Sequence, residues 1–463
     1  MKLKMQEVIK AVEGTLAQGS MDSIVKGVST DSRSIAEGEL FFALKGPNFD
    51  GHVFVRDIAL KGAAGAVVES AEGLGIIPPS FNVILVKDTL LALGGLASYF
   101  RGLHKIPFVA ISGSAGKTTT KEMIASILGR SRNVLKTEGN KNNLIGLPLT
   151  LFRLTPEHEA AVVELGISEI WEMERLVEMC RPDVAVITNI GRGHLKTLGS
   201  LEGVANAKGA LFTRLGSHAI KIVNLDDPWA VRLAKGSENT VTYSLKEKAD
   251  VRVKGCSVDE DLNAVTALYD IRGRELSVRI NAPGVANVVN GAAAIAAALS
   301  LGVPLEDMKE GLSSFSTIRG RMHILRAGGL VLLDDTYNAN PESMTSALRT
   351  LKAAKGRKVA VLGDMLELGE AAEAEHCGIG RMAGELGIDL IVAVGDNSGK
   401  VAEGAISAGA RHVYSFREKK EALIALKGLL KHGDSVLVKG SRGVRLEEIV
   451  EGLKEAGQKK ACC

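Results

Sequence analysis

A short glycine loop, Gly113-Ser-Ala-Gly-Lys-Thr118, stands between a predicted strand and a predicted helix. The apolar run PFVAIS before it suits a buried strand, and TTTKEMIASILG after it has apolar residues at helical spacing. A phosphate chain needs inward-pointing backbone N–H groups, a lysine and a hydroxyl that can join a magnesium ion, and this loop supplies all three. The full pattern would have glycine where the chain has Ile111, so the loop is a shortened form. We therefore favour ATP binding over an ordinary tight turn, with contacts from Gly113, Ser114, Ala115, Gly116, Lys117, Thr118 and Thr119.

The alternation of strand and helix patterns predicts an α/β protein with three domains. At about 150 residues per domain, a chain of 463 residues is long enough for three. Short strands and helices with frequent glycine breaks fill residues 1–103, and the strand before the glycine loop opens a second unit over residues 104–320. A third alternation covers residues 321–463. These boundaries are placed where each pattern restarts.

The sequence patterns of the second and third units each predict a largely parallel sheet. In the second, buried-strand candidates at 160–165, 184–189 and 219–224 are separated by helical stretches at 170–180 and 201–215. In the third, five strand candidates each precede a helical pattern: LVLLDD, KVAVLG, DLIVAV, HVYSF and SVLVK. Such a series is typical of a doubly wound, Rossmann-like domain.

Composition narrows the possible partners. The net charge is +3, from 57 basic and 54 acidic residues mixed along the chain, and only 4% of residues are aromatic, which argues against nucleic acid. The longest apolar stretch, Gly291–Val303, is shorter than the ~20 residues that cross a bilayer, and no signal peptide pattern opens the chain. Five cysteines without metal-ligand spacing fit a reducing cytoplasm, and Cys462 and Cys463 are expected to form an exposed end. We expect a cytoplasmic monomer whose partners are small molecules.

Polar residues follow two predicted strands of the second unit, where open α/β sheets bind ligands. Glu164 lies at the end of AAVVEL, and His194 follows VAVITN. Magnesium prefers oxygen, which favours the carboxylate over the imidazole as a ligand. On spacing alone, a solvated glutamate and a structural histidine remain open alternatives. Lys208 lies in the helical segment VANAKGALF, and this local pattern alone predicts that it is a surface lysine.

Two further segments are rich in hydrogen-bonding side chains. TEGNKNNLIG, residues 137–146, contains three asparagines that suit a substrate with amides and sugar hydroxyls, although asparagine and glycine also build turns. In LDDTYNANP, residues 333–341, a strand delivers four polar residues to its end, namely Asp335, Tyr337, Asn338 and Asn340. The same segment predicts a helix that begins with Asn340 as its cap and Pro341 in its first turn. Ligand contact and helix capping are compatible.

Taken together and in order, these segments resemble the Mur ligases. The resemblance is carried by STDSR (29–33), FFALKG (41–46), FDGHVF (49–54), GSAGKTTTKE (113–122), GNKNNLIGLPLTL (139–151), TNIGRGHL (188–195), ANAKGALF (205–212), DDTYNANPESM (334–344), VLGDMLELG (361–369) and VKGSRGVR (438–445). DTYNANP, LGDMLELG and KGSRG resemble the branch of the family that adds D-alanyl-D-alanine to UDP-N-acetylmuramoyl-tripeptide. The resemblance implies an N-terminal domain for the UDP-sugar, a central ATPase and a C-terminal domain for the incoming dipeptide.

The resemblance also implies roles for single residues. The catalytic set comprises Lys117, Glu164, His194 and Lys208. Two magnesium ions are implied, with ligands from Thr118, Glu164, His194 and Lys208, the last as a carbamate derived from CO2. Beyond the glycine loop, ATP contacts are implied for Asn287, Asn290, Arg321 and Asp335. The UDP-muramoyl peptide is assigned to Ser32, Arg33, Lys45, Gly46, Thr137, Asn140, Asn142 and Asn143. The dipeptide is assigned to Tyr337, Asn338, Lys439 and Ser441.

Two positions depart from the family pattern. Family members usually read H-N-x-x-N where this chain has Ala286-Asn287, and H-L-E where it has His194-Leu195-Lys196. The first departure affects one adenine contact. The second exchanges an acid for a base near the metal site, and neither removes an implied metal ligand.

The implied chemistry is amide formation driven by ATP. The tripeptide carboxylate attacks the γ-phosphate to give an acyl phosphate, which the dipeptide amine then attacks. The nearest alternative is another ligase of this family that adds a single amino acid or glutamate, and the branch-specific segments argue against it. An alternative of a different class is a P-loop kinase or an ATP-gated binding protein.

Overall fold

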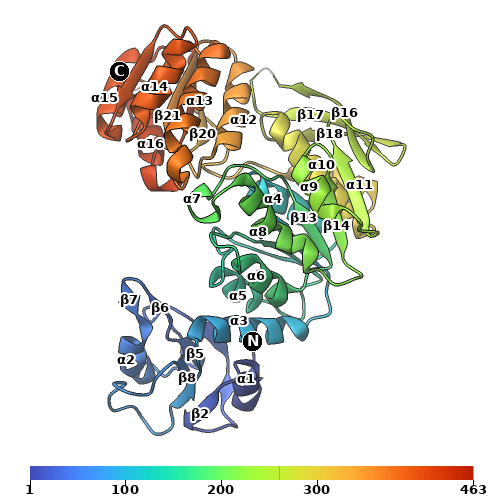
Figure 1. Ribbon diagram of the computed structural model, residues 1–463, viewed down its shortest axis with the longest axis vertical. Coiled ribbons are helices and arrows are strands. Elements are labelled where there is room, and N and C mark those ends of the chain that lie inside the picture. The colour runs from blue at the N-terminus through green and yellow to red at the C-terminus, as the bar shows by residue number, and fades with distance from the viewer. Residues whose placement is uncertain (260, 462–463) are drawn as a thin grey trace.

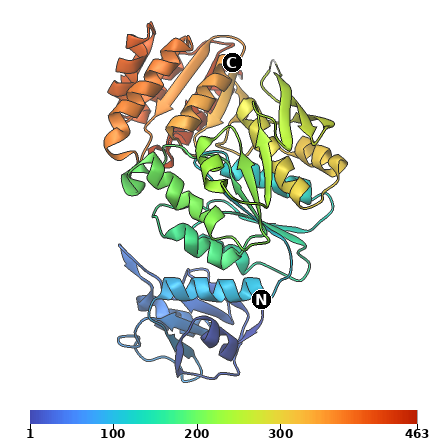
Figure 2. The ribbon, with the colours of Figure 1, turned by 45° about the vertical axis from the view of Figure 1, so that its right-hand side comes forward.

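The computed structural model describes residues 1–259 and 261–461, so the expected exposed end at Cys462 and Cys463 lies outside the described residues. Three α/β units, each with its own main sheet, follow one another along the molecule (Figure 1). The central unit lies between the other two in both views (Figure 2). The predicted α/β class with three domains is confirmed. Within the described ranges, no helix has the length and apolar character needed to cross a bilayer.

The N-terminal unit is built on a five-stranded sheet in the order β2-β9-β8-β5-β4, parallel except at β2. Its strands are β2 (Thr15–Gln18), β4 (Gly27–Ser29), β5 (Glu39–Phe42), β8 (Gly65–Val68) and β9 (Asn82–Leu85). Two small antiparallel pairs accompany it, β1 (Leu3–Lys4) with β3 (Ile24–Val25) and β6 (Lys45–Gly46) with β7 (Phe49–Asp50). The helical elements here are α1 (Met5–Ala11), η1 (Gly51–Phe54) and α2 (Val55–Leu60).

Helix α3 (Thr89–Gly102) joins the N-terminal unit to the central one. Asp88 caps its start by accepting a hydrogen bond from the Leu91 amide at 2.8 Å. Its buried face, which includes Leu96, belongs to one apolar core with Leu147 and Met173 of the central unit. Figure 1 shows the helix lying across the joint. The two units are therefore joined through a common hydrophobic core and not only through the connecting chain.

The central unit carries a nine-stranded sheet in the order β11-β12-β10-β13-β14-β15-β16-β17-β18. Its strands are β10 (Phe108–Ser112), β11 (Val134–Lys136), β12 (Ala160–Glu164), β13 (Val184–Ile187), β14 (Ile220–Asn224), β15 (Thr240–Ser244), β16 (Val251–Val258), β17 (Val265–Ile271) and β18 (Arg274–Ile280). Pairings from β11 to β16 are parallel, as predicted, whereas β16, β17 and β18 pair antiparallel. The antiparallel extension was not predicted.

Helices cover both faces of this sheet, which is why its strands read as continuous apolar runs. Core residues join one face to α4 (Lys117–Leu128), α10 (Val285–Ser300) and α11 (Leu305–Ser314). The other face is covered by α5 (Gly146–Leu151), α6 (Glu172–Cys180), α7 (Leu195–Leu198), α8 (Leu201–Thr213) and α9 (Pro228–Ala234). The predicted helices at 170–180 and 201–215 are confirmed as α6 and α8, each with slightly shorter bounds.

The C-terminal unit has a six-stranded sheet in the order β19-β20-β24-β21-β22-β23. The five predicted strands are confirmed as β20 (Leu330–Asp335), β21 (Lys358–Gly363), β22 (Leu390–Val394), β23 (Val413–Phe416) and β24 (Ser435–Lys439). An additional edge strand, β19 (His323–Ala327), pairs antiparallel with β20. One face packs on α12 (Pro341–Lys352), α13 (Ala372–Glu385) and α14 (Ser398–Ser407), and the other on α15 (Lys419–Leu429) and α16 (Glu447–Ala461). Single 3-10 turns occur at η2 (Gly369–Ala371) and η3 (Arg442–Val444).

Candidate active site

The glycine loop connects β10 to α4 in a conformation that only glycine adopts without strain. Gly113 has a φ of 143° and Gly116 a φ of 84°. A Cβ atom on Gly116 would lie 2.6 Å from Oδ1 of Asn290 on α10, so this position has no room for a side chain. The loop therefore brings its backbone close to the helix that carries the implied adenine contacts.

Lys117 begins α4 and folds back over the loop. Its Nζ donates a hydrogen bond to the Gly113 carbonyl oxygen at 2.8 Å. Burial lowers the pKa of Lys117, Glu164 opposes that shift, and Arg321 adds to it. The ammonium thus lies near both a carboxylate of the central unit and a guanidinium at the joint with the C-terminal unit.

Glu164 ends β12 beside the loop, and the residue is 2% exposed. One oxygen accepts a hydrogen bond from the Thr118 hydroxyl at 2.7 Å, and the other accepts one from the Asn142 side-chain amide at 2.7 Å. The backbone amide of Glu164 donates to the Thr137 hydroxyl at 3.0 Å. These bonds hold the Glu164 carboxylate and the Thr118 hydroxyl together at the start of α4.

Thr137 is enclosed within the central unit. Its side chain is fully buried, and its carbonyl oxygen accepts a hydrogen bond from Lys121 Nζ at 2.6 Å. The Thr137 hydroxyl therefore helps to position the end of β12, and its implied contact with the UDP-muramoyl peptide stays a prediction.

Oxygen donors at this place fit magnesium. Hydroxyl and carboxylate oxygens are the ligands that this ion prefers, and it usually takes only one or two carboxylates and completes its shell with phosphates and water. Among residues 1–259 and 261–461, no group of three His, Cys, Asp or Glu side chains could hold a metal by itself. A magnesium ion bound here could take the Thr118 hydroxyl and the Glu164 carboxylate as ligands, with phosphate and water oxygens completing its shell.

Lys208 projects from α8 and is only 1% exposed, so the surface position expected from its local pattern is wrong. Burial lowers the pKa of Lys208 to about 7, and the nearby charge of Lys117 acts in the same direction. Within the described ranges its ammonium has neither a hydrogen bond nor an ion pair. A buried, unpaired lysine of this kind is present partly as the neutral amine near pH 7.

His194 lies in the loop between β13 and α7 with a left-handed φ of 60°. Its Nδ1 lies 2.6 Å from a carboxylate oxygen of Glu367, which belongs to the C-terminal unit. The same loop receives two further contacts from that unit: Arg192 pairs with Glu375 at 2.7 Å, and its amide donates to Glu342 at 3.0 Å. The C-terminal unit therefore lies directly on this loop.

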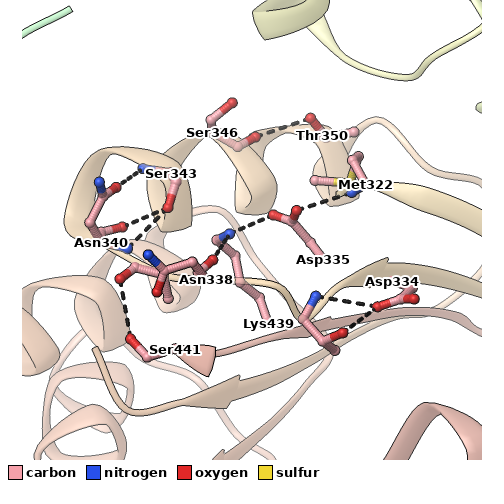
Figure 3. Close-up of polar contacts among 12 residues, drawn as sticks. Met322, Asp334, Asp335, Asn338, Asn340, Ser343, Ser346, Thr350, Lys439 and Ser441 are labelled. Carbon is pink, nitrogen blue, oxygen red and sulfur yellow. Dashed lines mark hydrogen bonds and ion pairs between the residues drawn. The ribbon is translucent and has the colours of Figure 1, made fainter. Parts of the chain in front are cut away.

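The end of β20 forms a polar cluster in the C-terminal unit (Figure 3). Lys439, 2% exposed on β24, donates to Asp335 at 2.6 Å and to the Asn338 carbonyl at 2.9 Å. The predicted cap is confirmed, since the Asn340 side chain accepts from the Ser343 amide at 2.9 Å and Pro341 follows it. The Asn340 side chain also donates to the Ser114 carbonyl at 3.1 Å, which ties this cluster to the glycine loop.

A cavity of about 590 Å³ collects most of the implied site residues at the joint of the central and C-terminal units. Those that line it are Ser114, Ala115, Gly116, Lys117, Thr119, Asn140, Asn142, Asn143, Glu164, His194, Asn287, Asn290, Arg321, Asp335, Tyr337, Asn338 and Lys439. The implied residues that are buried and do not line it are Gly113, Thr118, Thr137, Lys208 and Ser441. Arg321 stacks on the Tyr337 ring at 4.0 Å, so the two residues form part of one wall.

The remaining implied residues lie in the N-terminal unit and do not line this cavity. Arg33 is exposed and pairs with Asp31 at 2.6 Å, while the Ser32 carbonyl accepts from Lys61 at 2.7 Å. Lys45 and Gly46 form β6. The residues assigned to the UDP-muramoyl peptide are thus divided between the N-terminal unit and the cavity that contains the asparagines.

Sequence reasoning missed several carboxylates of the site, among them Glu342 and Glu367. Glu342 lines the cavity from the first turn of α12, and Glu367 contacts His194. Both lie inside segments that carried the resemblance, DDTYNANPESM and VLGDMLELG. Their position in those segments was the available signal, but their contacts depend on how the C-terminal unit docks.

Three family models match the chain in order. They are "Mur ligase family, catalytic domain" over residues 24–101, "Mur ligase middle domain" over residues 111–298 and "Mur ligase, glutamate ligase domain" over residues 320–442. The UDP-N-acetylmuramoyl-tripeptide--D-alanyl-D-alanine ligase of Bacillus subtilis (strain 168) is 37% identical over 460 residues, covering 98% of this chain and 99% of that protein. The enzyme of the same name from Escherichia coli (strain K12) is 38% identical over 448 residues, covering 94% and 95%.

Solved structures agree with these relatives. A crystal structure of MurF from Acinetobacter baumannii superposes with a TM-score of 0.91 at 34% identity, covering 98% of this chain and 99% of that chain. The MurF ligase of Thermotoga maritima in complex with ADP superposes with a TM-score of 0.84 at 28% identity, covering 94% and 99%. On the fold, the assembled cavity and these matches along nearly its whole length, the chain belongs to the Mur ligase family.

Proposed function

We propose that this protein joins D-alanyl-D-alanine to UDP-N-acetylmuramoyl-tripeptide at the expense of ATP, in the synthesis of a peptidoglycan precursor. The observation that carries the proposal is the cavity shared by the glycine loop, the Glu164 carboxylate and the Asp335–Lys439 cluster. A ligase must bring a nucleotide, an acid and an amine together, and here the surfaces that would hold them converge. The relatives named above, matched over nearly their full length, support the choice of substrates.

Each unit has a separate part in this proposal. Residues 1–103 would hold the UDP-sugar through Ser32, Arg33, Lys45 and Gly46, while residues 104–320 would bind ATP. Residues 321–463 would present the dipeptide through Tyr337, Asn338, Lys439 and Ser441. All these residues come from one chain, so we propose that a monomer is sufficient. Its substrates would be a nucleotide sugar, a dipeptide and ATP, and we propose that the reaction takes place in the cytoplasm.

The residues of the cavity would assist transfer of the γ-phosphoryl group to the tripeptide carboxylate. Lys117 would face the β- and γ-phosphates, where its charge offsets the charge that develops in the transition state. Asn287 and Asn290 would lie along the adenine, and Arg321 would approach the nucleotide from the joint with the C-terminal unit. The dipeptide amine would then attack the acyl phosphate and release phosphate. Docking of the C-terminal unit over the glycine loop would exclude water that hydrolyses this intermediate.

Two magnesium sites belong to the proposal. Thr118 and Glu164 would hold one ion, and His194 with carbamylated Lys208 would hold the second. When bound, the ions would offset negative charge on the phosphoryl group and the attacking carboxylate. The proximity of Thr118 and Glu164, at 2.7 Å, supports the first site.

The carbamate on Lys208 is supported by the surroundings of that side chain. With a pKa near 7, a fraction of the amine is neutral under ordinary conditions, and only the neutral amine attacks CO2. The nitrogen bonds to the carbon of CO2 and loses a proton, which leaves a carbamate anion. The change replaces a cation that is repelled by Lys117 with an anion that is attracted to it.

Phosphate release from ATP tests the function. We expect release only when both UDP-tripeptide and D-alanyl-D-alanine are present. Release with a single amino acid in place of the dipeptide would indicate a different ligase of the family. Phosphate transfer to an acceptor without amide formation would indicate a kinase.

A further inference from the structure

The contact between His194 and Glu367 joins two loops of unusual backbone conformation. His194 has a φ of 60° and Glu367 a φ of 65°, values that side-chain-bearing residues adopt only where their surroundings enforce them. The Lys196 amide donates to the Glu367 carbonyl oxygen at 3.0 Å. A Cβ atom on Gly369 would lie 3.3 Å from the Lys196 Cα atom, so the two loops pack tightly. The backbone on both sides thus fixes where the imidazole and the carboxylate meet.

The carboxylate determines which imidazole nitrogen is free. Nδ1 of His194 lies 2.6 Å from Oε2 of Glu367, and we assign the ring proton to Nδ1 because a carboxylate accepts there. That tautomer leaves the lone pair of Nε2 available, and His194 lines the cavity. Histidines that bind metals usually donate their other ring N–H to a carboxylate or carbonyl, which orients the ring and raises its basicity.

We propose that Glu367 is a positioning residue: docked from the C-terminal unit, it fixes the tautomer and orientation in which His194 Nε2 can bind magnesium. This inference rests on the proposed function, because it requires His194 to be a metal ligand. Its consequence is that the second magnesium site of the central unit is complete only while the C-terminal unit lies on the loop.

The alternative is that Glu367 is one ion-pairing group among several that hold the units together. The Glu367 side chain is 59% exposed, and ion pairs this exposed contribute little to stability. The chain offers a matched control in Glu375, which pairs with Arg192 of the same loop at 2.7 Å. Among the described residues, Glu375 makes neither a hydrogen bond nor an ion pair with the His194 imidazole. Both ion pairs cross the joint between the central and C-terminal units. Of the two carboxylates, Glu367 is the one that contacts His194.

The test measures binding of Mn²⁺, in place of Mg²⁺, to the full chain with a non-hydrolysable ATP analogue, by electron paramagnetic resonance of the free ion. We expect Glu367→Gln to weaken one Mn²⁺ site by about tenfold or more, whereas Glu375→Gln changes it by less than about twofold. We also expect the Glu367→Gln enzyme to need more Mg²⁺ for half-maximal rate and to recover most of its kcat at saturating Mg²⁺. An unchanged Mn²⁺ affinity in Glu367→Gln, or an equal loss in both variants, would overturn the proposal.

His194→Ala separates this inference from the proposed function. If His194→Ala loses one Mn²⁺ site and Glu367→Gln keeps that site intact, the positioning role is wrong and the metal role of His194 stands. If His194→Ala keeps both sites, His194 is not a ligand, and the metal assignment and the inference fail together. Thermal unfolding of each variant checks that the comparison is between folded proteins.

Discussion

Lys439 of β24 donates a hydrogen bond to Asp335 of β20 at 2.6 Å, and Lys439 is 2% exposed. The two strands pair in parallel, so this bond crosses between neighbouring strand ends at the wall of the cavity. The same ammonium donates to the Asn338 carbonyl. One buried cation therefore holds the segment that leads from β20 into α12.

Removing that cation should cost stability. Lys439→Met leaves the Asp335 carboxylate without its partner, and we expect a loss of about 3–5 kcal/mol in the free energy of unfolding by urea. Adding Asp335→Asn to Lys439→Met should recover at least about 1 kcal/mol, because the double variant no longer contains an unpaired charge. Additive losses in the double variant would show that the pair is not coupled.

Arg33 is proposed to hold the UDP-muramoyl peptide in the N-terminal unit. Arg33→Ala should raise the KM for UDP-tripeptide by about tenfold, because charge-assisted hydrogen bonds to phosphate or carboxylate are strong. The KM for ATP and the melting temperature should not change, since the side chain is 88% exposed. Arg232→Ala, an exposed arginine of the central unit, is the control. Equal effects of Arg33→Ala on both KM values would contradict the assignment.

Lys208 is proposed to act as a carbamate. Lys208→Ala and Lys208→Arg should both be nearly inactive, because alanine has no amine and the arginine guanidinium stays protonated and does not form a carbamate. Small carboxylic acids should partly restore amide formation to Lys208→Ala by filling the vacated space. Full activity in both variants, with no response to added acid, would show that no carbamate is needed.

The lowered pKa of Lys208 predicts how the free energy of unfolding depends on pH when CO2 is removed. Its pKa falls from an ordinary 10.5 to about 7 on folding. Below pH 7 both states carry the proton, and the folded state bears the whole cost of a buried cation. Between pH 7 and 10.5 the unfolded state binds more protons, so the stability of the wild type rises with pH. Lys208→Met should therefore be more stable than the wild type by up to about 5 kcal/mol below pH 7, with the difference shrinking as pH rises.

Urea unfolding at about pH 6, 8 and 9.5 measures this difference. Bicarbonate should raise the stability of the wild type and leave Lys208→Met unchanged. A difference that is constant across the pH range would mean that the folded protein holds Lys208 with an ordinary pKa.

The sequence predicted the glycine loop and the parallel strands well because their signals are local. A buried strand, two loop glycines with positive φ and a helix with one buried face follow one another from β10 to α4. The antiparallel strands β16 to β18 were missed, although β17 alternates between buried and partly exposed residues in the way that predicts a half-covered strand.

The surroundings of single side chains were harder to predict. Lys208 has the local pattern of a surface residue, and its burial arises only when α8 packs on the sheet. Glu367 gains its contact with His194 only through docking of the C-terminal unit. Such contacts join segments that are far apart in the chain. The spacing and periodicity of residues within one segment therefore cannot predict them. The resemblance to the Mur ligases pointed to Lys208 where the local pattern did not.

The proposed reaction can be tested by following an oxygen atom from substrate to product. UDP-N-acetylmuramoyl-tripeptide labelled with oxygen-18 in its terminal carboxylate is incubated with the protein, ATP, Mg²⁺ and D-alanyl-D-alanine, and the phosphate released is examined by mass spectrometry. An acyl phosphate intermediate predicts one labelled oxygen in phosphate for each amide formed, and no labelled phosphate when the dipeptide is omitted. Amide formation with unlabelled phosphate, or phosphate release without any amide, would contradict the proposed reaction.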